Sequence, residues 1–423
     1  MLRFATSPTS DMHISDLRVA IINYIISQQR KEDLIVRIED TDKDRNIEGK
    51  DQEILDICSL FGIEYSQIIY QSQNVRFHSA MALQLVHEKK AFSCFCSSNW
   101  IEKKQNEAKV AKKPYQYDDA CRNLPAELVI DNTSPFSIRV AKPNDSIVVK
   151  DYVMGDRTFK SETIDSFTIL NQDKTPTYDF MSAVDDMLND ISIVVRSDDQ
   201  LENTPKQEHI RNSLQYDKKV EYAHIPAIES ENSISIKQLL EDGYLPESIS
   251  NYLISMGNKA PKEIFTMQEA VEWFDLNAMS KSPTRFDIEA LKEINKAHLK
   301  NLDAKELSRY VGFADAEIGE LARIYLDEVQ TTKELKAKIA PVFTQRNIPQ
   351  EFKEQTATMT TVIKSAPYFD KYDDFENYIM EKTGLKGDDF IVPLRILLTN
   401  AQSGPNVADI YKHLKNYIGE IIK

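Results

Sequence analysis

The apolar positions near the start of the chain follow two different spacings. Residues 2–5 and 34–38 are short continuous apolar runs, whereas the apolar residues between 17 and 25 recur at helical spacing. This order predicts a strand, a helix and a second strand of a parallel sheet. In such a unit a ligand binds beyond the carboxyl ends of the strands, with phosphates near the helix N-terminus, where unpaired amides favour negative charge. The Ser-Pro-Thr turn at residues 7–13 is therefore a predicted nucleotide site.

The middle of the chain interrupts this pattern. An amphipathic segment at residues 51–61 completes the first part, and a polar, lysine-rich stretch then runs from about residue 72 to 184. This stretch carries short runs with β propensity at residues 136–140, 146–153 and 166–170. Short strands separated by irregular polar sequence are typical of an insertion into a larger fold.

The strand pattern returns once more and then gives way to helices. Residues 191–196 form a continuous apolar run, as expected of a strand that is buried on both faces of a parallel sheet. From Ile236 onward the pattern is almost entirely helical, with predicted turns at Gly243, Gly257, Pro283 and Gly404-Pro405. We therefore expect an α/β first part and a helical last third.

Length and composition narrow the class of protein. The 423 residues suffice for two to four domains, and 41% hydrophobic with 28% charged residues is ordinary for a globular protein. There is no run of 18 apolar residues, and the N-terminus leads directly into a strand. We therefore expect no membrane span, no signal peptide and a cytoplasmic location.

The formal net charge of −15 argues against a protein that binds nucleic acid over its whole surface. It leaves room for confined basic patches, for which the candidates are Lys103-Lys104 with the lysines that follow to Lys113, and Lys412 with Lys415. Solvated helix faces are the alternative interpretation of both patches.

Three of the four cysteines are grouped. Cys58 lies in an apolar helical pattern and is expected in the core, whereas Cys94, Cys96 and Cys121 lie in the polar stretch. In a reducing compartment this spacing favours a metal site over disulfides.

A series of short motifs, in one order, connects the chain to a known family. The opening turn, followed by Arg37-Ile38-Glu39-Asp40-Thr41-Asp42, resembles the signature of the glutamyl-tRNA synthetases, which belong to class I of the aminoacyl-tRNA synthetases. The resemblance covers essentially the whole chain, through Tyr70-Gln71-Ser72-Gln73, Cys94-Phe95-Cys96, Thr175-Pro176-Thr177-Tyr178-Asp179-Phe180, Val184-Asp185-Asp186, Asn203-Thr204-Pro205-Lys206-Gln207, Pro393-Leu394-Arg395 and Ser403-Gly404-Pro405. The combination is specific, although no single motif would suffice.

The resemblance implies a fold class and a domain order. It implies an α/β Rossmann-type catalytic domain with an inserted α+β acceptor-binding region, followed by all-α stem-contact and anticodon-binding domains. In this sequence we expect the first Rossmann half at residues 1–71, the insertion at 72–184, the second half at 185–235, the stem-contact domain at 236–300 and the anticodon-binding domain at 301–423.

The resemblance also implies the site residues and a reaction. ATP, with Mg²⁺, would activate L-glutamate to glutamyl-adenylate, and the glutamyl group would then pass to the 3′ end of tRNA(Glu), with tRNA(Gln) as a further candidate. His13 is the expected catalytic residue, because its counterparts hydrogen-bond the ATP phosphates and stabilise the transition state. The glutamate ligands would be Arg3, Ala5, Ser7, Glu39, Tyr178 and Arg196. The ATP site would comprise Pro8, Thr9, His13, Ser15 and Asp16.

The charges of glutamate agree with the predicted ligands. Its α-ammonium needs an acidic partner such as Glu39, and its carboxylates can each be bound by the forked guanidinium of an arginine. Surface salt bridges are the alternative role for these charges. A monomer without membrane contact is expected.

A zinc site is implied in the insertion. Cys94, Cys96 and Cys121 supply three ligands, one fewer than a closed tetrahedral site needs. The histidine that many relatives place two residues after the third cysteine is Asn123 here. Tyr117 is the candidate fourth ligand, since a tyrosine has this role in the related glutamyl-queuosine synthetases. The alternative is a site that has lost its metal.

The ATP site departs from the family pattern. Ser10 and Ser15 replace glycines that allow close approach to a ligand or a positive φ. Ser197 replaces a third, because Arg196-Ser197-Asp198-Asp199-Gln200 stands where the family commonly has Arg-Gly-(Asp/Glu)-(Asp/Glu)-His near the adenine pocket. After Pro226 the family carries a Gly-Lys-Lys-(Leu/Met)-Ser-Lys-Arg loop that neutralises the triphosphate, and here that loop is expected to be deleted.

A second segment, Met279-Ser280-Lys281-Ser282, imitates the missing loop. We interpret it as a helix boundary, with Ser282 as the N-cap and Pro283 at the first helical position.

Three functions remain open on the sequence. The first, which we favour because the residues that would face the amino acid and the helical C-terminal region are present, is an active glutamate–tRNA ligase. The second is a catalytically weak or inactive paralogue that binds tRNA or glutamate, which the ATP-site departures favour. The third is a glutamyl-queuosine synthetase, but those relatives lack the helical C-terminal region.

Overall fold

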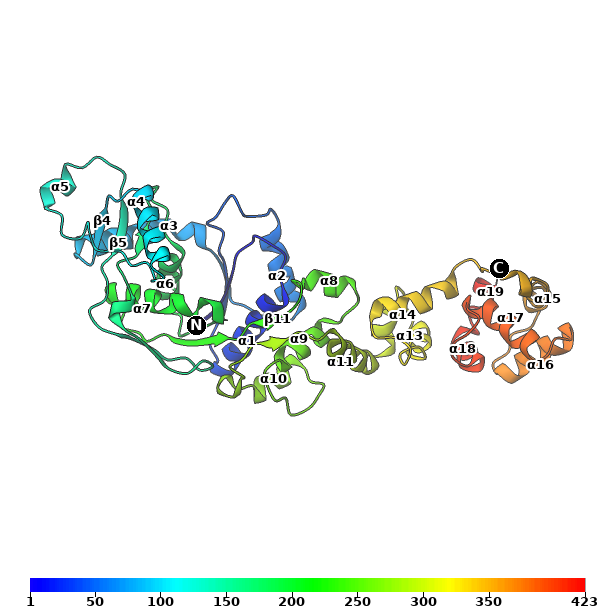
Figure 1. Cartoon of the computed structure of the whole chain (residues 1–423). Helices are drawn as coiled ribbons and strands as arrows, with labels where there is room; N and C mark the ends of the chain where they lie inside the picture. Colours follow the sequence, from blue (N-terminus) through cyan, green and yellow to red (C-terminus); the bar gives the residue numbers. More distant parts are fainter. Residues whose placement is uncertain (423) are drawn as a thin grey trace. The chain divides into compact units, whose positions relative to one another are not determined.

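The predicted strand, helix, strand unit is confirmed at the start of the computed structural model, which describes residues 1–422 (Figure 1). β1 (Leu2–Thr6) and β2 (Leu34–Ile38) pair in parallel, and α1 (Ile14–Arg30) connects them. β3 (Gln67–Tyr70) follows α2 (Lys50–Leu60) and pairs in parallel with the other edge of β2. All three strands therefore present their carboxyl ends at one edge of the sheet.

A second parallel pair extends this arrangement. β9 (Ile193–Ser197) is buried, as its apolar run predicts, and pairs with β10 (Glu221–Ile225). The start of β9 is joined to β1, because the Ser192 amide donates to the Met1 carbonyl at 2.9 Å. The Asn23 side chain of α1 also donates to the Val195 carbonyl at 3.1 Å. The carboxyl ends of β1 and β9 therefore lie next to the same candidate binding site.

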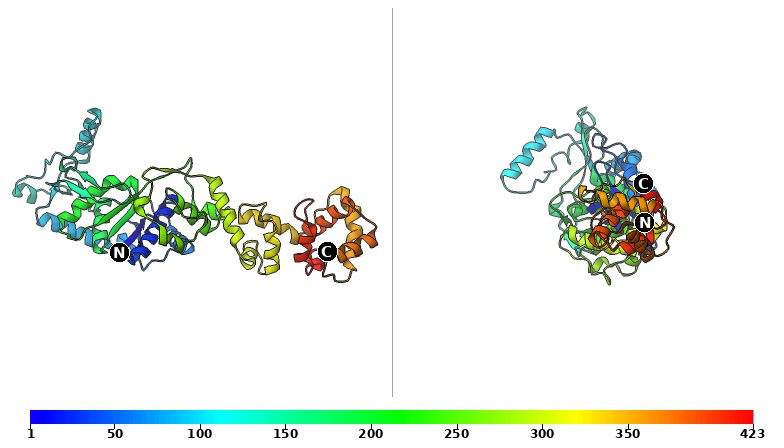
Figure 2. Two further views of the ribbon diagram at one scale, coloured as in Figure 1. Left: turned by 90° about the horizontal axis from the view of Figure 1, so that it is seen from below. Right: turned by 90° about the vertical axis from the view of Figure 1, so that its right-hand side faces the viewer.

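The chain between β3 and β9 forms antiparallel sheets, and each of the predicted β-rich runs contains a strand. Two sheets form there, one from β4 (Ala91–Cys94), β5 (Ser137–Val140) and β8 (Thr168–Leu170), the other from β6 (Ile147–Val149) and β7 (Arg157–Phe159). Helices of this region and its border are α3 (Val75–His87), α4 (Ser98–Val110), α5 (Ala126–Ile130), α6 (Tyr178–Leu188) and α7 (Thr204–Ser213). α4 buries none of its residues and projects from the rest (Figure 2).

The prediction of a helix that starts at Pro283 is wrong. β12 (Thr284–Arg285) instead pairs in parallel with β11 (Ile228–Glu229), and this pairing keeps the chain extended after Pro283. The next helix, α11 (Ile288–Asn301), begins later because the Asp287 side chain accepts from the Glu289 amide at 2.9 Å. Asp287, not Ser282, is the N-cap.

The chain forms two compact units. The first comprises residues 1–236, 253–261 and 267–286, and the second comprises residues 237–252, 262–266 and 287–423. The residues of α8 (Ile236–Glu241), α9 (Pro246–Ser255) and α10 (Met267–Trp273) are divided among these two units.

The last third is helical, as predicted, and residues 288–422 contain no strand. Its helices after α11 are α12 (Ala304–Tyr310), α13 (Ala316–Arg323), α14 (Thr332–Ile339), α15 (Lys353–Lys364), α16 (Tyr372–Thr383), α17 (Asp388–Thr399), α18 (Val407–Leu414) and α19 (Ile418–Ile421). Gly243 forms the predicted turn with a φ of +88°, and a Cβ there would lie 2.5 Å from the Lys333 amide. Among the described residues, no helix has the length and apolar character that a bilayer span requires.

Candidate active site

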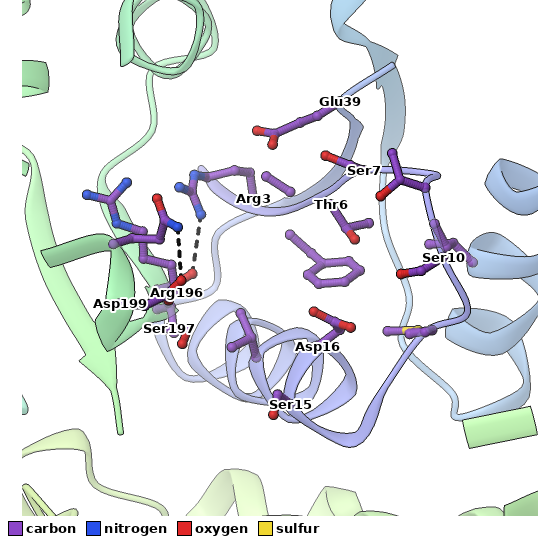
Figure 3. Close-up of a pocket in the computed structure, with 18 of the residues that line it drawn as sticks. Arg3, Thr6, Ser7, Ser10, Ser15, Asp16, Glu39, Arg196, Ser197 and Asp199 are labelled. Atoms are coloured by element: carbon purple, nitrogen blue, oxygen red, sulfur yellow. Dashed lines mark hydrogen bonds between the residues drawn. The ribbon is translucent and has the colours of Figure 1, made fainter. Parts of the chain in front are cut away.

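A pocket of about 500 Å³ lies beyond the carboxyl ends of β1, β2 and β9, at the N-terminus of α1 (Figure 3). Its position follows from the topology, because parallel strands gather their carboxyl ends at one edge and leave a crevice there. All six predicted glutamate ligands and three of the predicted ATP ligands line it, namely Arg3, Ala5, Ser7, Glu39, Tyr178, Arg196, Thr9, Ser15 and Asp16. The structure thus brings residues from four distant parts of the chain together.

Arg3 is held by a buried carboxylate. Its Nε donates to Asp186 Oδ1 at 3.1 Å and its Nη1 to the Val195 carbonyl at 3.2 Å. Arg37 of β2 donates to the same Asp186 oxygen at 2.6 Å. Asp186 is fully buried, but the positive charges of Arg3 and Arg37 outweigh that burial and lower its pKa to about 2. The orientation of Arg3 is therefore fixed before any ligand binds.

Arg196 has a different set of partners, all neutral. Its Nε donates to His224 Nε2 at 3.1 Å, its Nη1 to Gln207 Oε1 at 2.9 Å and its Nη2 to Thr204 Oγ1 at 2.8 Å. Burial lowers the pKa of Arg196. These bonds use three of the five guanidinium N–H groups, so one N–H on each terminal nitrogen remains to bind the two oxygens of a carboxylate.

Acidic side chains lie across the hollow from each other. Figure 3 shows Glu39 on one side and Asp16 on the other, with Arg3 beside Glu39. Glu39 accepts from Arg37 Nη2 at 3.3 Å. Asp16 accepts from the His13 amide at 3.0 Å, and burial raises the pKa of Asp16. The Glu39 carboxylate can therefore accept from an ammonium group of a ligand, whereas the neighbouring guanidinium group of Arg3 suits a carboxylate.

Two predicted ATP ligands, Pro8 and His13, do not line the pocket. Pro8 is buried, and its carbonyl accepts from the Ile47 amide at 2.9 Å. His13 is the residue immediately before α1 and forms an antiparallel bridge with Ser235. The short segment after β11, where the family has its lysine loop, is therefore paired with the turn that carries His13.

The three serines at family glycine positions have ordinary backbone conformations. Ser10, Ser15 and Ser197 all line the pocket, and none has a positive φ. The loss of glycine consequently stores no backbone strain here. The replacement of glycine by serine therefore changes only the pocket wall, where each serine adds a Cβ and a hydroxyl.

The pocket wall is acidic. Its charged residues are the arginines Arg3 and Arg196 and the acids Asp11, Asp16, Glu39 and Asp199, and no lysine is among the described residues that line it. The nearby Lys50 is paired with Asp11 and with Glu53, which lies at 2.8 Å. Among the residues that the structure describes, the end of the pocket next to α1 therefore has no unpaired lysine in its lining to neutralise a triphosphate.

Sequence reasoning missed the residues that support the two arginines. Asp186 is within a quoted motif but was assigned no role, and Asp151, Thr204, Gln207 and His224 were not identified as candidates. The available signal was composition, since a charged pair such as Asp185-Asp186 in an otherwise apolar helix needs buried partners.

The cysteine cluster has formed as predicted. The sulfur atoms of Cys94, Cys96 and Cys121 lie within 4.8 Å of one another. The Tyr117 hydroxyl lies 3.4 Å from Cys94 Sγ and 3.5 Å from Cys96 Sγ, and it accepts from the Cys121 amide at 3.1 Å. Three sulfur atoms and one phenol oxygen therefore converge, in the number that a tetrahedral zinc site requires.

Comparisons with known proteins agree on one family. A family model described as the catalytic domain of class I tRNA synthetases (E and Q) matches residues 1–293. Glutamate–tRNA ligase 2 of Sulfurimonas denitrificans is 62% identical, and glutamate–tRNA ligase 1 of Nitratiruptor sp. is 48% identical, both over 100% of each chain. The crystal structure of a glutamate tRNA ligase from Elizabethkingia meningosepticum, in complex with its amino acid, has a TM-score of 0.81 at 21% identity and covers 100% of this chain and 98% of its own.

The lengths of these alignments agree with the expected deletion of a loop. The alignments to both relatives run over 432 positions, whereas the chain has 423 residues. At least nine positions of each alignment therefore have no counterpart in this chain, in accord with a deletion.

Proposed function

Because this chain belongs to the glutamate–tRNA ligases of the class I tRNA synthetases, we propose that the pocket beyond β1, β2 and β9 is where it activates L-glutamate. The product would be glutamyl-adenylate, from which the glutamyl group passes to the 3′ end of tRNA(Glu). One observation carries the assignment: two buried, pre-oriented arginines face the same hollow as Glu39. Glutamate has the complementary charges, two carboxylates and one ammonium.

The chemistry needs positioning more than a nucleophilic side chain. The α-carboxylate of glutamate attacks the α-phosphorus of ATP, and pyrophosphate leaves. Arg196 is the proposed ligand of the side-chain carboxylate and Glu39 of the ammonium, with Arg3, Ala5, Ser7 and Tyr178 around them. ATP is proposed to lie at the N-terminus of α1, near Pro8, Thr9, His13, Ser15 and Asp16, where the helix dipole favours phosphate. Mg²⁺ bound with ATP would neutralise part of the phosphate charge.

The remaining parts are proposed to handle the RNA. The antiparallel region at residues 72–184 would receive the acceptor end, residues 236–300 would contact the stem, and the helical region 301–423 would read the anticodon. We propose that the protein acts as a monomer in the cytoplasm. tRNA(Gln) is a second candidate substrate, so both tRNAs belong in the assay.

The direct test is pyrophosphate exchange that depends on glutamate, followed by charging of tRNA(Glu) and tRNA(Gln). Exchange with glutamate but not with glutamine or aspartate would support the proposal. The absence of exchange and of glutamate binding, with either tRNA present, would refute it.

Glu39→Gln is expected to weaken glutamate binding. The change removes the negative partner of the α-ammonium, and a hydrogen bond to a charged group contributes about 1.5–3 kcal/mol. KM for glutamate should therefore rise by roughly 10- to 100-fold, with KM for ATP unchanged. Glu48→Gln, an exposed acid outside the pocket, is the control. Equal effects of both variants on KM for glutamate would contradict the assignment of Glu39.

We also propose that Cys94, Cys96, Tyr117 and Cys121 hold one zinc ion, which would tie β4 to the loop at residues 117–121. Bound zinc is expected to stabilise the protein by about 2–4 kcal/mol, because it binds only the folded site. Elemental analysis should find one zinc per chain, and chelation should lower the melting temperature. Cys121→Ser should abolish zinc binding, and Cys58→Ser, remote in α2, should retain it. Purified protein that takes up no zinc would refute the site.

A further inference from the structure

A buried histidine–aspartate pair lies outside the pocket and contacts Arg196 through its histidine. His224 on β10 and Asp151, which follows β6 of the inserted region, are 0% and 3% exposed. His224 Nδ1 bonds Asp151 Oδ2, and His224 Nε2 accepts from Arg196 Nε at 3.1 Å. The two ring nitrogens of one histidine thus connect an acid of the insertion to an arginine of the pocket.

The hydrogen bonds determine which nitrogen of His224 carries the proton. A guanidinium N–H can only donate, so His224 Nε2 must present a lone pair to Arg196. Thr204 Oγ1 also lies 3.1 Å from this nitrogen, and because it accepts from Arg196 Nη2 its own proton can point to the same lone pair. The proton of the neutral ring must then be on Nδ1, where it donates to the Asp151 carboxylate. Burial, together with the nearby Arg196 charge, lowers the pKa of His224 and favours this neutral form.

Asp151 is itself rigidly oriented. Its Oδ1 accepts from the Val153 amide at 3.0 Å and the Met154 amide at 2.8 Å, so Oδ2 is left to face His224. The backbone on either side is also fixed, because the Tyr152 amide donates to the Tyr222 carbonyl of β10 at 2.9 Å. The carboxylate therefore reaches the ring in one geometry.

We propose that Asp151 and His224 are positioning residues for glutamate recognition: Asp151 fixes the Nδ1–H tautomer of His224, and His224 Nε2 then holds Arg196 with its two free N–H groups directed at the side-chain carboxylate of the substrate. This inference rests on the proposed function of Arg196. Neither residue lines the pocket, so both act through Arg196.

Asp151→Asn makes the sharpest test. Its amide oxygen would replace Oδ1 at the two backbone amides, so its NH₂ group would face His224 Nδ1. The ring would then carry its proton on Nε2, where it would oppose the Arg196 N–H. Removing the hydrogen-bond partner of a metal ligand typically lowers affinity or activity 10- to 100-fold, and we expect an effect of the same order for a partner of Arg196. KM for glutamate should therefore rise by about 10- to 100-fold while KM for ATP stays unchanged.

Glu221→Gln is the matched control. Glu221 lies on the same strand as His224 and accepts from Lys150 at 3.0 Å, Tyr152 at 2.7 Å and Arg30 of α1 at 2.7 Å. It therefore joins the insertion to β10 and α1 without contacting Arg196. If Asp151 only anchored the insertion, both acid-to-amide changes would raise KM for glutamate equally. That outcome would overturn the proposal.

Nitrogen chemical shifts of the histidine rings give a readout that needs no activity. In the ¹⁵N-labelled full chain, the signal that disappears in His224→Gln identifies His224 among the seven histidines. We expect the Nδ1–H form in the wild type and the Nε2–H form in Asp151→Asn. An Nε2–H ring in the wild type would overturn the proposal.

The double variant completes the test. If Asp151 acts only through His224, adding Asp151→Asn to His224→Gln should not change KM for glutamate further; an additional increase would refute that route.

Should the wild type neither bind glutamate nor catalyse exchange, the proposed function would fall. In that case the nitrogen chemical shifts alone would show whether Asp151 determines which nitrogen of His224 carries the proton.

Discussion

Insertion of a Gly-Lys-Lys-Leu-Ser-Lys-Arg segment between Glu231 and Asn232 is expected to accelerate formation of glutamyl-adenylate by roughly 10²- to 10³-fold, the factor associated with one well-placed charge-stabilising group. The physical reason is the charge of the pocket, whose described lining residues include four acids and no lysine. Negative charge that develops on the departing pyrophosphate therefore has little support from side chains. The inserted lysines would supply it, and kcat of glutamate-dependent pyrophosphate exchange would measure the gain.

The controls for this insertion separate charge from flexibility. Glu231 and Asn232 are exposed and lie in a bend after β11, so the chain can accept additional residues there. A Gly-Ser segment of equal length, inserted at the same point, should leave kcat near that of the parent chain. If both insertions raise kcat equally, release of the bridge between His13 and Ser235 would explain the gain, and the argument from charge would be wrong.

Asp186→Ala is expected to destabilise the first unit by about 3–5 kcal/mol, the cost of leaving buried charge without its partner. Arg3 and Arg37 are 3% and 1% exposed, and both bond the same oxygen of Asp186. Urea unfolding would measure the loss. Asp56→Ala, at an exposed acid of α2 that accepts from the Gln52 side chain at 2.8 Å, should change the free energy of unfolding by less than about 1 kcal/mol.

The same carboxylate gives stability a defined dependence on pH. Its pKa in the folded protein is about 2, below the ordinary value of 3.8. A depressed pKa means that the folded state binds the proton less tightly than the unfolded state, so stability is complete above about pH 4 and falls as the pH drops towards 2. Asp186→Asn should flatten this part of the stability profile. An unchanged profile in that variant would contradict the assignment.

The sequence predicted the elements of the catalytic half well, because its strands and helix differ in apolar spacing. β1, β2, β9 and α1 all lie where the pattern places them, and the motifs identified nine residues that line the pocket. The interpretation of Ser282 and Pro283 failed for a tertiary reason. Pairing of Thr284–Arg285 with a strand more than fifty residues earlier has no local signal.

The residues that hold Arg196 in place could not be predicted from the sequence either. Asp151 and His224 are 73 positions apart, and their bond depends on how the insertion lies against β10. Gln207 and Thr204 were visible only as part of a motif, without an indication that they hold Arg196. Periodicity reveals which face of an element is apolar, but it carries no information on which polar groups meet inside the fold.

The shared carboxylate at Asp186 also limits how the preference for an amino acid could change. Arg3 belongs to the scaffold as much as to the binding site, since the group that orients it also neutralises Arg37. Replacing Arg3 to accept an uncharged amino acid would leave Asp186 with an altered charge balance and weaken the sheet. Arg196 rests on neutral partners, so it is the position at which selection or design could alter substrate choice at a smaller structural cost.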